Sequence, residues 1–120
     1  MKAYILKLTF EGIVPEVWRK VVIPAGATFN RLHETIQNVT NFKSHIGVYH
    51  YFSFPLEDVI ITNSEDMIQQ KEVAGKQVKQ PTRIKIDKYL EEDGQLLYQY
   101  DFADDWKIKI VLEEIVEDYY

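Results

Sequence analysis

Side chains divide with a period of two into a mainly apolar face and a mixed face in two segments of the chain, residues 3–10 and residues 48–54. This period of two is typical of strands with one buried face. Residues 17–23 are rich in β-branched side chains, which favour strands. A break containing Gly12 and Pro15 separates residues 3–10 from residues 17–23, so the pattern predicts that these two strands form an antiparallel pair.

A helical period follows at residues 29–41. Thr28 precedes this segment and is a residue type that caps the first turn of a helix. Four apolar residues recur at helical spacing and define one stripe that we expect to be buried: Phe29, Leu32, Ile36 and Val39. The pattern therefore predicts one long helix over residues 29–41.

A hairpin is predicted at residues 98–112, where apolar residues alternate on both sides of an acidic turn. A three-residue loop, residues 103–105, keeps the apolar faces of the two strands together. It also places Asp101 opposite Lys107 as a cross-strand charge pair. The register predicts three pairs: Phe102 with Trp106, Tyr100 with Ile108 and Tyr98 with Ile110.

The pattern is weaker between residues 55 and 94. Residues 59–62 are predicted to return as a short strand after residues 48–54, and Asn63 or Ser64 to cap a short helix. Residues 71–81 are polar, with Gly75 and Pro81, and are interpreted as an exposed loop. Residues 83–90 fit either a strand or a short helix.

These elements predict an α+β fold in which a mainly antiparallel sheet is covered on one face by one long helix. A length of 120 residues with 46% apolar side chains is typical of a single globular domain, residues 1–120. The apolar runs are too short to cross a bilayer, and no cysteine is present. We therefore expect a soluble, cytoplasmic protein without a membrane partner.

The net charge of −5 is unevenly distributed. Residues 1–86 carry 11 Lys and Arg against 8 Asp and Glu, whereas residues 87–120 carry 3 against 11. An acidic protein repels phosphate backbones, so nucleic-acid binding is disfavoured. The cations of residues 71–88 lack interleaved aromatic residues and are interpreted as a solvated surface.

The candidate catalytic residues are His33, His50 and Asp101. His33 lies at the edge of the apolar stripe of the predicted helix, where a structural histidine is the favoured interpretation, although its side chain suits proton transfer near neutrality. Asp104 and Asp105 lie near Asp101 and together offer carboxylate ligands for Mg²⁺ or Mn²⁺. Turn residues are the favoured interpretation of these aspartates, because aspartate is common in turns.

Two motifs carry a family resemblance: PEVWRK, at residues 15–20, and YDFADDW, at residues 100–106. With VVIPAGATF, Leu32 and His33 between them, the chain resembles the Ri-plasmid ORF-three-like family, whose members are also labelled TnpR-type passenger proteins of insertion elements. The resemblance implies a small α+β domain and no established activity. The histidine that precedes the aromatic strand in the family matches either His45 or His50.

Two classes of function remain open. The favoured one is a non-catalytic accessory or protein-interaction module associated with a mobile element, acting on a protein partner or by self-association without a cofactor. Its aromatic residues support it, because we expect Tyr49, Tyr51, Tyr119 and Tyr120 to lie outside the core. The alternative is a metal-dependent hydrolase or phosphodiesterase with the three aspartates and a histidine. Trp18 is interpreted as a core-edge residue flanked by solvated cations.

Overall fold

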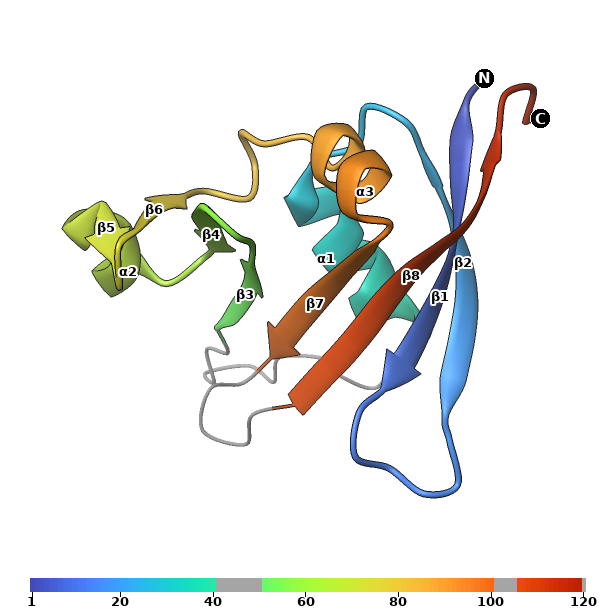
Figure 1. Cartoon of the computed structure of the whole chain (residues 1–120), viewed down its shortest axis with the longest axis horizontal. Coiled ribbons are helices and arrows are strands. Elements are labelled where there is room, and N and C mark those ends of the chain that lie inside the picture. Colours follow the sequence, from blue (N-terminus) through green and yellow to red (C-terminus); the bar gives the residue numbers. More distant parts are fainter. Residues whose placement is uncertain (41–50, 101–105, 120) are drawn as a thin grey trace.

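The computed structural model describes residues 1–40, 51–100 and 106–119. Within these residues, eight strands form one sheet in the order β2-β1-β8-β7-β3-β4-β6-β5 (Figure 1). The strands are β1 (Ala3–Phe10), β2 (Trp18–Pro24), β3 (Phe52–Pro55), β4 (Val59–Thr62), β5 (Glu72–Val73), β6 (Lys76–Lys79), β7 (Gln95–Tyr100) and β8 (Trp106–Val116). The same residues contain the helices α1 (Phe29–Val39), α2 (Glu65–Gln70) and α3 (Asp87–Asp93).

The predicted fold class, an α+β domain with a mainly antiparallel sheet covered on one face by one long helix, is wrong. The sheet is mixed, because β4 and β6 pair in parallel, and three short helices accompany it in the described residues. Helix α1 has 11 residues, which is about 16 Å of helix. Eight strands about 4.8 Å apart span roughly 34 Å. One helix of this length is therefore too short to cover the sheet.

Strand β1 lies between β2 and β8 and pairs antiparallel with both. Its alternation places Tyr4, Leu6 and Leu8 in the core, each with 0% of its surface exposed. Tyr4 pairs with Ile23 and Leu6 with Val21, so β2 turns the same alternate positions inward. The predicted antiparallel pair of the first two strands is confirmed.

The hairpin of β7 and β8 is confirmed, but its predicted register is wrong by two residues. The predicted pairs of Tyr100 with Ile108 and of Tyr98 with Ile110 do not form, because Tyr100 pairs with Trp106 and Tyr98 with Ile108. The predicted pairs of Phe102 with Trp106 and of Asp101 with Lys107 involve residues that lie outside those the structure describes. A shift of two residues keeps every side chain on its face, so the alternation does not distinguish the two registers. The observed pairs include Tyr100 with Trp106, Gln99 with Lys107 and Tyr98 with Ile108.

Helix α1 begins and ends as its sequence predicts to within two residues. The Thr28 hydroxyl accepts a hydrogen bond from the Arg31 N–H at 3.2 Å, and the Thr40 N–H donates to the Ile36 carbonyl at 3.1 Å. The buried residues of the stripe are Phe29, Leu32 and Ile36, while Val39 packs partly buried against the same core. None of the described helices is long and apolar enough to cross a membrane.

Residues 71–81 are not the continuous exposed loop that was predicted. They contain β5 and β6, and β6 pairs in parallel with β4 after the connection through α2. Every side chain of β5 and β6 is at least partly exposed. The side chains of these strands therefore show little alternation of apolar and polar residues, because backbone hydrogen bonds hold the strands and neither face is buried.

The remaining short elements resolve the open alternatives. The Ser64 hydroxyl caps α2 by accepting from the Met67 N–H at 3.5 Å. The short strand at residues 59–62 is confirmed as β4, antiparallel to β3. The segment at residues 83–90 leads into a helix, α3, which ends at Asp93 and is capped by Gly94. This glycine has φ 71°, a left-handed conformation that glycine adopts without steric strain.

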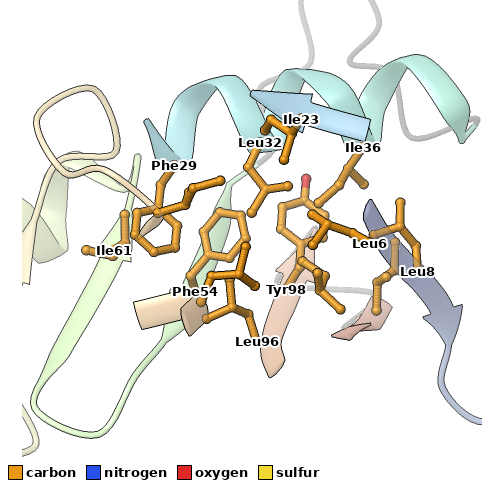
Figure 2. Close-up of a cluster of buried hydrophobic side chains, with 14 of the residues drawn as sticks. Leu6, Leu8, Ile23, Phe29, Leu32, Ile36, Phe54, Ile61, Leu96 and Tyr98 are labelled. Atoms are coloured by element: carbon orange, nitrogen blue, oxygen red, sulfur yellow. The ribbon is translucent and has the colours of Figure 1, made fainter. Parts of the chain in front are cut away.

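Figure 2 shows the core, in which α1 lies over the aromatic side chains of the sheet. The Phe54 ring centre is 5.0 Å from that of Phe29 and 5.1 Å from that of Tyr98. These rings come from β3, α1 and β7, so one cluster joins three segments that are distant in sequence. Buried Leu90 of α3 belongs to the same core.

Candidate functional site

His33 lies on α1 and faces two aromatic residues of the sheet. Its Nδ1 lies 2.9 Å from the Tyr98 hydroxyl oxygen, and its ring stacks on Phe52 with centres 3.7 Å apart and planes inclined by 8°. The Gln37 side-chain amide donates a hydrogen bond to the same hydroxyl at 3.2 Å. The Tyr98 hydroxyl donates its one proton to Nδ1 and accepts a hydrogen bond from Gln37, so it is satisfied both as a donor and as an acceptor.

Burial lowers the pKa of His33 to about 4. Burial also raises the pKa of Tyr98 well above its usual value. Both side chains are therefore neutral near pH 7, and neither is matched to proton transfer at that pH. The arrangement of His33, Tyr98 and Gln37 is that of a satisfied structural network, which agrees with the favoured interpretation of His33 as an edge histidine.

The other predicted site residues lie outside the residues that the structure describes. This holds for Asp101, Asp104 and Asp105, and also for His45 and His50. The metal site that the three aspartates would form with Mg²⁺ or Mn²⁺ therefore stays a prediction. Within residues 1–40, 51–100 and 106–119, no group of three or more histidines and carboxylates is placed to hold a metal ion.

A second polar cluster joins β1 to α3 and was not predicted from the sequence. The Tyr4 hydroxyl lies between two carboxylates, 3.0 Å from Asp87 Oδ2 and in hydrogen-bond contact with Glu91 Oε2, and shares its single proton between them. Lys2 Nζ lies 2.9 Å from the same Glu91 oxygen, and the Gly26 N–H donates to Asp87. The hydrogen bond from Tyr4, together with Lys2, lowers the pKa of Glu91. The cluster fixes the first turn of α3 against the N-terminal strand.

The sequence gives a weak signal for this cluster, because Tyr4 is more than 80 residues from Asp87 and Glu91 along the chain. Asp87 and Glu91 are four residues apart and therefore share one face of a helix. That spacing becomes informative only once residues 87–93 are known to be helical. The burial of Tyr4 then requires a partner for its hydroxyl.

Strand β2 forms one end of the sheet, and no described strand pairs with its outer side (Figure 1). The Phe10 N–H donates to the Val17 carbonyl at 3.0 Å, and the Ala25 N–H donates to the Lys2 carbonyl at 2.9 Å. These two bonds lie just before and just after β2. Because the bonding direction alternates along an antiparallel strand, the N–H groups of odd-numbered residues of β2 point to β1.

The N–H and C=O groups of Trp18, Lys20 and Val22 therefore point away from the sheet. The Trp18 carbonyl accepts a hydrogen bond from the Arg19 side chain at 2.9 Å, which is consistent with this direction. Pro24 ends the strand and has no N–H. The proline and the two cations of this strand are sequence features typical of an edge strand.

Trp18 is 45% exposed, so it does not lie at the edge of the core as predicted. It lies on the face of the sheet opposite to Leu6 and Val21, next to Thr9 in the register. Lys7 Nζ is 5.2 Å and Lys20 Nζ 6.0 Å from the centre of its ring, within the range of a cation–π interaction.

We call this surface the β2 edge. It comprises Trp18, Arg19, Lys20 and Val22 of β2 with Lys7 of β1. Val22 is 40% exposed. Lys20 forms an exposed ion pair with Glu113 at 3.0 Å, and such pairs contribute little to stability.

The expected exposure of tyrosines is confirmed where the structure describes them. Tyr51 and Tyr119 are each more than a third exposed, and Tyr49 and Tyr120 lie outside the described residues.

A cleft of about 440 Å³ near α3 is lined by carboxylates and lysines together. The lining residues include Asp58, Asp93, Lys79 and Lys88.

Comparison with known proteins links the chain to one family. The family model described as "Plasmid pRiA4b ORF-3-like protein" matches residues 2–120. An uncharacterized protein of Sinorhizobium fredii, y4hQ, is 29% identical over 113 residues, which are 90% of this chain and 52% of that protein. The chain therefore spans about half the length of this curated relative.

A solved structure has the same fold. The crystal structure of MM3350, a protein of unknown function from Methanosarcina mazei Go1, matches with a TM-score of 0.75 at 29% identity. The match covers 99% of this chain and 66% of the other protein. Both relatives are thus longer than the present chain and carry additional sequence beyond the matched part.

Proposed function

The chain belongs to the plasmid pRiA4b ORF-3-like family, and we propose that it is a non-catalytic protein-interaction module that binds its partner through the β2 edge. The plasmid reading frame after which the family is described supports a role associated with a mobile element. The single observation that carries the proposal is the exposure of Trp18 and Val22 along an edge whose outward backbone groups pair with no described strand.

The chemistry of the β2 edge supports binding. Trp18 offers a large ring at low cost in conformational entropy, and tryptophan is enriched among the residues that dominate interface energies. Its flanking cations, Lys7 and Lys20, keep the surface soluble while the partner is absent. The low pKa of His33 supports a non-catalytic role for that residue, because its neutral ring is held in a satisfied network.

Site-specific cross-linking tests this proposal. A photoreactive amino acid is placed at Val22 on the β2 edge and, as the matched control, at exposed Glu34 on α1. We expect the Val22 variant to capture one protein in cells of the source organism and the Glu34 variant to capture none. Mass spectrometry identifies the captured protein, which is then purified and titrated against the unmodified chain.

Binding of the purified partner decides the outcome. Trp18→Ala is expected to weaken it by about tenfold or more, because a central tryptophan of an interface contributes at least that much. Equal capture at Val22 and Glu34, or an affinity that Trp18→Ala leaves unchanged, would contradict the proposal.

A further inference from the structure

We propose that the β2 edge binds an extended segment of the partner protein as a ninth strand of the sheet, and that this segment carries acidic side chains opposite Arg19 and Lys20. This inference rests on the proposed function and names the chemistry of the partner. It follows from the backbone of β2, from the charges along it and from the exposed side chains that flank them.

The backbone of β2 offers the hydrogen bonds of a strand pair. The N–H groups of Trp18, Lys20 and Val22 point outward at every second residue, as derived from the bonds at both ends of the strand. An extended segment added to such an edge gains main-chain hydrogen bonds, and its alternate side chains give specificity. The bond from the Arg19 side chain to the Trp18 carbonyl is exposed, and an incoming N–H replaces it.

Length distinguishes this edge from the opposite edge of the sheet. Strand β2 has seven residues, whereas β5 at the other end has two. Short edge strands are one of the ways in which proteins prevent unwanted pairing. Of the two edge strands in the described residues, β2 is therefore the one suited to pair with an added strand.

The charges of β2 favour an acidic segment over a second copy of this chain. Residues 17–24 contain Arg19 and Lys20 and no acidic residue. A pair of two β2 strands brings the cations of both copies and no carboxylate of β2 together in every register, and a register centred on either cation places it directly opposite its own copy, where like charges are destabilising. The same cations attract glutamate or aspartate on a foreign strand, and Lys7 on the neighbouring strand adds to the attraction. Lys20 already pairs with Glu113, but this pair is exposed, so an incoming carboxylate can share or replace it at little cost.

The side chains on the exposed face predict an alternating pattern in the partner. Trp18, Lys20 and Val22 share this face, so the order along the edge is aromatic, cationic, aliphatic. Directly opposite positions on two strands lie close enough for pairwise contact. The matching face of the partner segment therefore reads apolar, acidic, apolar at every second residue.

A synthetic peptide tests the inference without knowledge of the natural partner. The probe has eight residues in which valine and glutamate alternate at every second position, on one face of the extended strand, with threonine at the positions between them, and its counterpart has lysine in place of glutamate. Both are titrated into the full chain while its backbone amide signals are followed by NMR. We expect the glutamate peptide alone to bind, with shifts concentrated in β2, slower hydrogen exchange at Trp18, Lys20 and Val22, and weaker binding at higher salt.

Two substitutions at one position separate backbone pairing from side-chain contact. Val22→Pro removes an outward N–H without touching the bonds to β1, and proline is tolerated on edge strands. Val22→Ala removes most of the side chain and keeps the N–H. We expect Val22→Pro to weaken peptide binding by about tenfold and Val22→Ala by less than threefold. Circular dichroism confirms that both variants fold.

The results that would overturn the inference are specific. Equal binding of the lysine peptide, equal loss in the two Val22 variants, or no protection of the three amides each contradicts strand addition by an acidic segment. Concentration-dependent protection of the same amides without peptide would show that a second copy fills the edge. If a partner is captured at Val22 while these amides stay unprotected, the proposed function holds and the inference alone is wrong.

Discussion

Phe54→Ala is expected to lower the free energy of unfolding by about 3–5 kcal/mol. Phe54 is fully buried, and its ring lies between Phe29 of α1 and Tyr98 of β7. Truncation loses the transfer free energy of the ring and leaves a cavity among side chains from three segments, which relax only in part. Urea denaturation followed by fluorescence measures this change.

Trp18→Ala is the matched control for Phe54→Ala, because it also removes a large aromatic ring. Trp18 is 45% exposed and lies outside the core, so we expect a loss of about 1 kcal/mol or less. If the two substitutions cost the same, the core does not lie between α1 and the sheet as described, or Trp18 has a structural role that excludes its assignment to the β2 edge.

His33 is expected to make stability depend on pH between about 6.5 and 4. Its pKa is about 4 in the folded chain and close to 6.5 in the unfolded chain, so the unfolded chain binds more protons in this range. Stability therefore rises with pH across the window, is fully present above pH 6.5 and is lost as the pH falls toward 4. The full shift corresponds to about 3 kcal/mol, and water around the partly buried ring reduces it to about 2.

His33→Asn provides the control for this pH dependence. The asparagine amide offers an acceptor near the position of Nδ1 for the Tyr98 hydroxyl but does not titrate. We expect its stability at pH 7 to be lower, since the stacking on Phe52 is lost, and its stability to change little between pH 6.5 and 5. Chemical denaturation at half-unit pH steps compares the slopes. Parallel curves for the two proteins would contradict a buried, neutral His33.

The sequence predicts those elements whose signal is local. Strand β1 and helix α1 follow from their periods of burial, and Thr28 marks the start of the helix. The hairpin of β7 and β8 follows from alternation, but its register does not, since two registers that differ by two residues place the same side chains inward. The predicted pairs of Tyr100 with Ile108 and of Tyr98 with Ile110 are wrong for this reason.

The elements that the sequence misses depend on distant parts of the chain. Strand β6 has no buried residue, and its parallel pairing with β4 leaves no pattern in its own side chains. The predicted fold class is wrong because α1 covers only part of the sheet, whereas the prediction has one helix covering the whole of one face. The Tyr4 cluster with Asp87 and Glu91 likewise needs the position of α3 before its residues can be related.

The β2 edge was visible in the sequence only in part. The cations and the final proline of residues 17–24 are typical of an edge strand, but which strand lies at the end of a sheet depends on the order of all its strands. Trp18 was assigned to the edge of the core for a related reason. Alternation in β2 does not by itself tell which face is buried until β1 is paired with it.

Hydrogen exchange of the free chain at low concentration tests the open edge of β2 most directly. The amides of Arg19, Val21 and Ile23 point to β1, whereas those of Trp18, Lys20 and Val22 point away from the sheet. We expect slow exchange for the first three amides and fast exchange for the other three, in alternation along one strand. Slow exchange at all six would mean that another segment already covers this edge, and a partner would then have no backbone to pair with.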